Sequence, residues 1–146
     1  MAEPRRRSDV PIYIVIAEPV EASRIEIVLA KDGYDVVPFR SAKQLWDNFK
    51  RCRPRYIITD RRFRDEFTAL DLCRNVREQY MLPYVYIHVL GRAGNMEVIE
   101  EVLSVGANDY SVKPLSPSQL RARVRVGLRW LGYIDSITAP AVGAKS

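Results

Sequence analysis

The sequence predicts an α/β protein, built as a doubly wound, five-stranded parallel sheet with helices on both faces. Three observations lead to this class. Five short apolar runs recur along the chain, segments with helical period lie between them, and capping residues mark the boundaries. Near-continuous apolar runs are typical of strands buried on both faces, and right-handed crossovers between alternating strands and helices favour this architecture.

The predicted strands are the five apolar runs, each rich in Ile, Val or Tyr. They cover residues 12–16, 34–39, 56–59, 84–89 and 110–112. Between them, apolar residues repeat every three or four positions, which is the spacing of one helix face. These repeats are Ile25, Val28 and Leu29; Leu45, Phe49 and Cys52; Leu72, Cys73 and Val76; Val98, Val102 and Leu103; and Leu120, Val124, Leu128 and Leu131.

The helix boundaries carry residues that start or end helices. Two sites match the capping box, in which two side chains satisfy each other's free backbone donors, and a third is a looser version. Prolines suit the first turn of two helices, and glycines end two. The capping boxes are Ser41 with Gln44 and Ser116 with Gln119, and the looser version is Thr68 with Asp71. The prolines are Pro19 and Pro117, and the glycines are Gly33 and Gly106.

The length of 146 residues corresponds to one domain. We assign residues 1–10 to a basic tail, 11–133 to the folded domain, and 134–146 to a flexible tail or the start of a linker. No apolar run is long enough to span a bilayer, and Glu18 and Pro19 interrupt the stretch that follows the basic N-terminus. We therefore expect a cytoplasmic protein without a signal peptide or a membrane partner.

Several function classes lack their usual signals. The sequence has no glycine-rich phosphate loop, no nucleophilic triad at predicted strand ends, and no metal-ligand spacing around Cys52 and Cys73, which argues against an enzyme. The net charge of +5 could favour nucleic acid, but no aromatic-interleaved basic run accompanies it. We therefore do not expect a nucleic-acid partner.

Chemistry is expected at the carboxyl ends of the strands, where open parallel sheets bind ligands. The predicted strands deliver four polar residues there: Glu18, Asp60, His88 and Lys113. A carboxylate, an imidazole and an ammonium that converge would suit a phosphoryl group or another anion.

Several segments resemble the receiver domains of two-component response regulators. The most specific one, residues 106–114, is similar to the family's fourth-helix end, fifth strand and lysine–proline turn. Residues 56–60 resemble the third strand with its phosphoacceptor aspartate, residues 69–74 the helix after it, and residues 14–34 the first strand and helix. The resemblance covers about residues 11–133 and implies the flavodoxin-like (βα)5 receiver fold.

The resemblance implies a phosphorelay function. In the family, an aspartate takes a phosphoryl group from a sensor histidine kinase or a phosphotransfer protein, and a lysine on the fifth strand contacts the phosphoryl oxygens. Asp60 and Lys113 match these two positions. Because phosphoryl transfer depends on positioning and charge stabilisation, a carboxylate nucleophile needs cations around it.

The expected metal site departs from the family, which holds Mg²⁺ with an acidic pair on the first strand. Counting back from Gly33 without a gap places Ile16 and Ala17 at the pair, and neither can bind a metal. Losing both carboxylates should weaken Mg²⁺ binding severely. A one-residue insertion would instead bring Glu18 into the pocket as a metal ligand beside Asp60, and a third interpretation makes Glu18 a carboxylate at a helix N-terminus.

Two residues match the family's switch positions, which report phosphorylation. His88 stands where the family has Ser or Thr, and it would either hydrogen-bond a phosphoryl group or an acidic partner, or pack as a buried side chain. Tyr110 matches the aromatic position three residues before Lys113. The stretch 90–95 is about three residues longer than usual, which puts the coupling to the fourth helix in doubt.

Arginines offer a substitute for the metal. Arg61 and Arg62 follow Asp60 directly, and one of them could pair with it and supply the missing positive charge. The alternative is a solvated basic loop.

The last helix carries a second basic stripe. Arg121, Arg125 and Arg129 are spaced by four residues, and Glu100 and Asp109 lie on neighbouring elements as ion-pair partners. The stripe is either a solvated helix face or part of the surface through which many receivers form homodimers, namely the family's fourth helix, fifth strand and fifth helix.

Two functions follow from these observations. The first is a receiver domain in two-component phosphorelay signalling, with Asp60 as phosphoacceptor, an atypical metal pocket, and a population shift between two conformations. The second keeps the fold without the chemistry: a phosphorylation-independent pseudo-receiver that acts as a protein–protein interaction module. Ile16, Ala17 and His88 favour the second version.

Overall fold

The computed structural model describes residues 9–139. A five-stranded sheet forms its centre, with all strands parallel and in the order β2-β1-β3-β4-β5. The strands are β1 (Ile12–Val15), β2 (Val36–Phe39), β3 (Tyr56–Asp60), β4 (Tyr86–Gly91) and β5 (Asp109–Val112). The helices are α1 (Pro19–Lys31), α2 (Ala42–Asp47), α3 (Phe49–Cys52), α4 (Ala69–Gln79), α5 (Met96–Ser104) and α6 (Pro117–Thr138). The predicted doubly wound class is confirmed.

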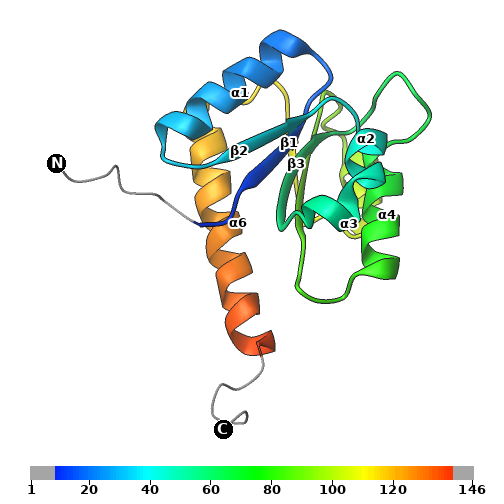
Figure 1. Ribbon diagram of the computed structural model, residues 1–146. Coiled ribbons are helices and arrows are strands. Elements are labelled where there is room, and N and C mark those ends of the chain that lie inside the picture. Colours follow the sequence, from blue (N-terminus) through cyan, green and yellow to red (C-terminus); the bar gives the residue numbers. More distant parts are fainter. Residues whose placement is uncertain (1–8, 140–146) are drawn as a thin grey trace, which may run out of the picture.

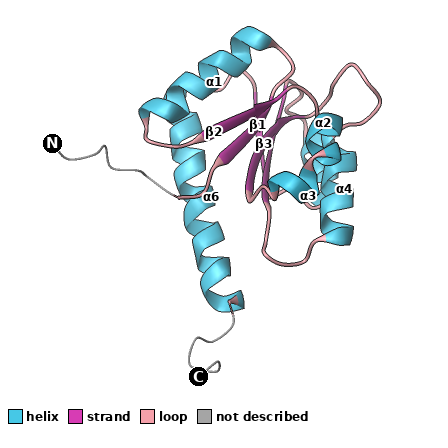
Figure 2. Cartoon of the chain, viewed as in Figure 1, coloured by secondary structure: helices cyan, strands magenta, loops and turns pink. Residues whose placement is uncertain are grey.

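The helices cover both faces of the sheet, as Figure 1 shows for α1 and α6 on one side and α2, α3 and α4 on the other. Figure 2 shows the strands enclosed between these two helical layers. Because successive side chains of a strand point to opposite faces of the sheet, each strand contributes side chains to the apolar core on either face. Ile57 and Ile87 pack with the α2–α5 layer, whereas Ile58 and Tyr86 pack with α1 and α6. Each face thus has its own apolar core.

The predicted caps are mostly present. Ser116 and Thr68 form full capping boxes, whereas Ser41 accepts from the Gln44 N–H and Gln44 accepts from the N–H of Arg40. Glycine is required where the chain leaves α1 and α5, because Gly33 and Gly106 have φ of 91° and 108°.

Several boundaries differ from the prediction, and strand β2, for example, begins at Val36 and not at residue 34. The second helix is divided at Asn48 into α2 and α3. Strand β4 begins two residues later than predicted and ends at Gly91, because its register pairs Tyr56 with Tyr86. Helix α6 continues past residue 133 to Thr138.

The predicted flexible tail therefore begins as helix. Leu131 is buried, and an ion pair of 2.6 Å joins Asp135 to Arg55, the residue before β3. Both contacts hold the end of α6 on the rest of the domain. Residues 1–8 of the predicted N-terminal tail and residues 140–146 lie outside the described residues. Within residues 9–139, no helix has both the length and the apolar character of a membrane span.

Candidate functional site

Asp60 ends β3 at the carboxyl edge of the sheet and is only 6% exposed. One carboxylate oxygen accepts a hydrogen bond from the Lys113 ammonium, and the other accepts from the Ala17 N–H at 2.9 Å. The two partners follow β1 and β5, so three strand ends meet on one carboxylate. Neighbouring β1 and β3 are where the strand order reverses, which is the usual ligand position in such sheets.

Lys113 connects this carboxylate to a second one. Its ammonium also donates to Glu21, at 2.7 Å, in the first turn of α1. Burial lowers the pKa of Lys113, but the hydrogen bonds to Asp60 and Glu21 outweigh it and hold that pKa above its ordinary value. The lysine is therefore a stable cation shared by two carboxylates. Sequence reasoning missed Glu21, and the available signal was an acidic residue in the first turn of the helix after β1.

Glu18 has a different role from the predicted metal ligand. It is the N-cap of α1, and its two oxygens accept from the N–H groups of Val20 and Glu21 at 3.0 and 2.8 Å. These hydrogen bonds lower its pKa, which favours the charged form at the helix N-terminus. Of the three interpretations, the geometry matches the helix-terminal carboxylate. Among residues 9–139, no group of three or more His, Cys, Asp or Glu side chains is placed to hold a metal ion.

A cationic pocket of about 370 Å³ opens beside Asp60. Four basic side chains line it against the single carboxylate of Asp60; they are Arg61, Arg62, Arg92 and Lys113. Leu90, Gly91 and Ala93 complete the wall. The pocket is therefore suited to an anion.

Neither arginine forms the predicted pair with Asp60, whose partners are Lys113 and the backbone of Ala17. Arg61 lies instead 3.9 Å from Glu101 of α5, and its buried Nε has no hydrogen-bond partner among the described residues. Lys113 lies against the Asp60 carboxylate, and Arg61 and Arg62 line the pocket in front of that carboxylate.

His88 lies away from this pocket, contrary to the prediction that it stands at the strand end. Strand β4 is shifted, so Leu90 is the register partner of Asp60, and His88 is fully buried on the α1–α6 face. Its Nε2 lies 2.7 Å from Ser111 Oγ and 3.8 Å from a carboxylate oxygen of Asp109. Burial outweighs Asp109 and lowers the pKa of His88 to about 4, so the imidazole is a neutral core group.

Tyr110 reaches the edge of the pocket. Its hydroxyl donates to the carbonyl of Ala93, which ties β5 to the loop after β4. The ring lies directly over Gly91, and a Cβ on that residue would collide with the Tyr110 hydroxyl. The glycine therefore allows the tyrosine this position.

The predicted interaction surface is divided between two sides of α6. Arg125 lies 3.9 Å from Asp32 at the end of α1, so the stripe that includes Arg121 faces α1. Asp109 instead lies 3.7 Å from Arg123. The α5–β5–α6 side includes the Asp109–Arg123 pair and the exposed Glu100 of α5, and the homodimer remains a prediction.

The comparison with known families agrees with this geometry. A family model, the response regulator receiver domain, matches residues 12–125. The chain belongs to the response-regulator receiver family. This family acts in two-component signal transduction, as the sequence predicted.

Curated relatives of this receiver are longer proteins. The probable transcriptional regulator ycf27 of Porphyridium aerugineum is 30% identical over 119 residues, and the DNA-binding response regulator MtrA of Mycolicibacterium smegmatis is 29% identical over 120. The alignments cover 80% and 81% of this chain but 47% and 50% of those proteins. The chain therefore spans about half the length of the curated relatives it matches.

Solved receiver structures share the fold. The chemotaxis protein CheY4 of Vibrio cholerae superposes with a TM-score of 0.74 at 21% identity, covering 82% of this chain and 99% of that one. A response regulator receiver domain protein from Clostridium thermocellum gives 0.75 at 19% identity, covering 86% and 98%. At such identities the likeness establishes the architecture.

Proposed function

We propose that this receiver accepts a phosphoryl group on Asp60 from a histidine kinase or a phosphotransfer protein, and that cations of the chain itself stabilise the charge. The observation that carries the proposal is the Asp60–Lys113 contact at the mouth of a pocket lined by three further cations. A carboxylate in that position is held in place by Lys113 and can attack a phosphorus atom that approaches from the open side of the pocket.

The chemistry would be a single phosphoryl transfer. An oxygen of Asp60 attacks the phosphorus of a phosphohistidine, the P–N bond breaks, and the leaving imidazole nitrogen keeps the bonding electrons and takes up a proton. The Ala17 N–H holds the second carboxylate oxygen in place. The Lys113 ammonium, held by Glu21, is then next to the new phosphoryl oxygens.

The donor set supports a site that works without a resident Mg²⁺. Magnesium prefers carboxylate and water oxygens. Here the end of β1 offers Ile16 and Ala17, Glu18 caps α1, and Glu21 is bonded to Lys113. Arg61, Arg62 and Arg92 line the pocket and would neutralise a phosphoryl group in the place of the metal.

Acetyl phosphate tests the acceptor. We expect intact-protein mass spectrometry to show the addition of one phosphoryl group, lost in Asp60→Asn and retained in Asp65→Asn. Asp65 is a matched control because it lies in the same loop, is exposed, and hydrogen-bonds only the Phe67 N–H among described groups. A mass increase that survives in Asp60→Asn would contradict the assignment.

A second candidate function is a phosphorylation-independent interaction module. The specific observation in its favour is that Leu90 stands in the register row of Asp60, so β4 presents no hydroxyl there to report a phosphoryl group. Absence of any mass increase, with or without metal, would leave this candidate.

A further inference from the structure

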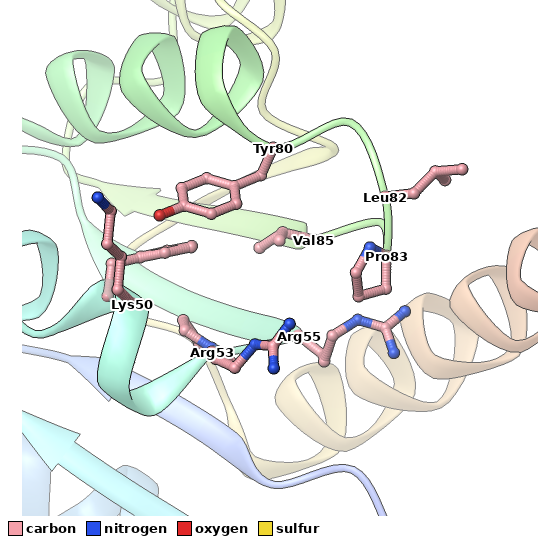
Figure 3. Close-up of a pocket in the computed structure, with 9 residues that line it drawn as sticks. Lys50, Arg53, Arg55, Tyr80, Leu82, Pro83 and Val85 are labelled. Atoms are coloured by element: carbon pink, nitrogen blue, oxygen red, sulfur yellow. The ribbon is translucent and has the colours of Figure 1, made fainter.

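A second cavity lies at the opposite edge of the sheet, where β3 and β4 begin. Its volume is about 310 Å³, which is within the range of small-ligand pockets. Figure 3 shows the side chains around it, contributed by α3, the end of α4, and the segments that lead into β3 and β4. The lining residues are Phe49, Lys50, Arg53, Pro54, Arg55, Tyr80, Leu82, Pro83 and Val85.

The interior of this cavity is apolar and aromatic. Phe49 and Val85 are each 3% exposed, and the ring centroids of Phe49 and Tyr80 are 4.9 Å apart. Trp46 supports both rings from behind, at 5.3 and 6.3 Å. Because these contacts restrain the rings, the cavity presents a preformed apolar and aromatic wall.

Among the described residues, the charged side chains that line the cavity are all positive. Three lining residues are basic and none is acidic. Arg55 is held by the carbonyl of Tyr84 and by Asp135, but Lys50 and Arg53 form no ion pair or side-chain hydrogen bond with any described residue. Both residues line the cavity; in Figure 3, the Lys50 ammonium lies on the side of the Tyr80 hydroxyl and the Arg53 guanidinium on the side of Arg55. Two cations that have no ion-pair partner among residues 9–139, at an apolar cavity, suit a ligand that has both a ring and an anionic group.

Arg53 adopts an unusual backbone conformation to reach this position. It ends α3 with φ 51° and ψ 56°, in the left-handed region that favours glycine. A residue other than Gly or Asn there costs about 1 kcal/mol or more. Strained residues of this kind cluster at functional sites.

We propose that this cavity binds a small aromatic carboxylate, with the ring against Phe49 and Tyr80 and the carboxylate at Arg53 and Lys50. The site is independent of Asp60 and of the proposed phosphoryl transfer, because it lies at the amino ends of the strands. The loop before β4, which contains the exposed Leu82, lines the cavity and would respond to a bound ligand.

3-Phenylpropionate is the probe, and its neutral amide is the matched ligand. We expect the carboxylate to produce saturable amide shifts of Arg53, Tyr80 and Val85 in the ¹H–¹⁵N spectrum, and the amide to bind much more weakly. A charge-assisted hydrogen bond predicts that Arg53→Gly weakens binding by about tenfold or more. Glycine preserves the left-handed backbone, so this variant should fold.

Arg51→Ala is the control. This substitution removes one positive charge from the same short helix, and Arg51 does not line the cavity. It should bind within about twofold of the wild type. Lys50→Ala is an independent second variant at an exposed position. The proposal fails if the wild type shows no saturable shifts at these residues, if the amide binds equally well, or if both Arg53→Gly and Lys50→Ala bind as tightly as Arg51→Ala.

Discussion

Two glycines of α6 provide a matched test of how this helix packs on the sheet. An added Cβ at Gly127 would lie 2.9 Å from ring carbons of both Tyr56 and Tyr86, whereas a Cβ at Gly132 would meet nothing within 4 Å. Replacing glycine by alanine in a helix gains up to about 1 kcal/mol at either position. Overpacking a core costs about 1–3 kcal/mol.

The upper end of that cost applies at Gly127, because the two tyrosine rings are stacked with centroids 4.9 Å apart and Tyr56 is fully buried. We therefore expect Gly127→Ala to lose about 2 kcal/mol and Gly132→Ala to gain up to about 1 kcal/mol. The two variants should therefore differ by about 3 kcal/mol in unfolding free energy. The gain in helix propensity is the same for both and cancels in this difference, which leaves the cost of overpacking.

Urea unfolding followed by circular dichroism measures both free energies. The two variants should have equal m-values, so that the difference appears in the midpoints. If both variants were stabilised to the same extent, the close contact of α6 with Tyr56 and Tyr86 would be refuted.

Three further perturbations test other parts of the structure. Gly91→Ala should displace Tyr110 from the carbonyl of Ala93, and the Tyr110 ring signals should shift in NMR spectra; unchanged signals would contradict the contact. Burial lowers the pKa of His88 to about 4 in the folded protein, against 6.5 in the unfolded chain. As the pH decreases between these values, the unfolded chain binds a proton before the folded protein does, so the free energy of unfolding falls by up to about 3 kcal/mol. Urea unfolding should show this slope in the wild type and not in His88→Gln, and equal slopes would refute a neutral buried imidazole. Arg77 donates to three acceptors, one on Val85 just before β4 and two in the α5–β5 turn, so Arg77→Ala should cost about 3 kcal/mol or more in unfolding free energy, and a loss under about 1 kcal/mol would contradict this bonding.

Most of the architecture was predictable because hydrophobic burial determines it. Strands buried on both faces leave apolar runs, and helices leave a period of three to four residues, so the alternation and the edge that holds Asp60 and Lys113 could be predicted without coordinates. The end of α6 could not, because its stabilising partner, Arg55, is remote in sequence from Asp135.

The errors in the site have similar causes. Residues 84–91 are apolar throughout except for His88, so nothing local marks where β4 begins, and pairing with β3 decides it. A shift of two residues keeps each side chain on its face but moves His88 below the pocket. Glu21 was missed because its contact with Lys113 depends on how α1 lies over the sheet.

Phosphorylation of the metal-stripped protein tests the central claim most directly. With acetyl phosphate and excess EDTA, the account predicts that Asp60 is still modified, and that Arg62→Ala with Arg92→Ala slows the reaction. Arg64→Ala should not, because Arg64 is exposed in the same loop but does not line the pocket. Phosphorylation that occurs only with added Mg²⁺, or that is unaffected by removing both pocket arginines, would contradict a site whose positive charge comes from the chain itself.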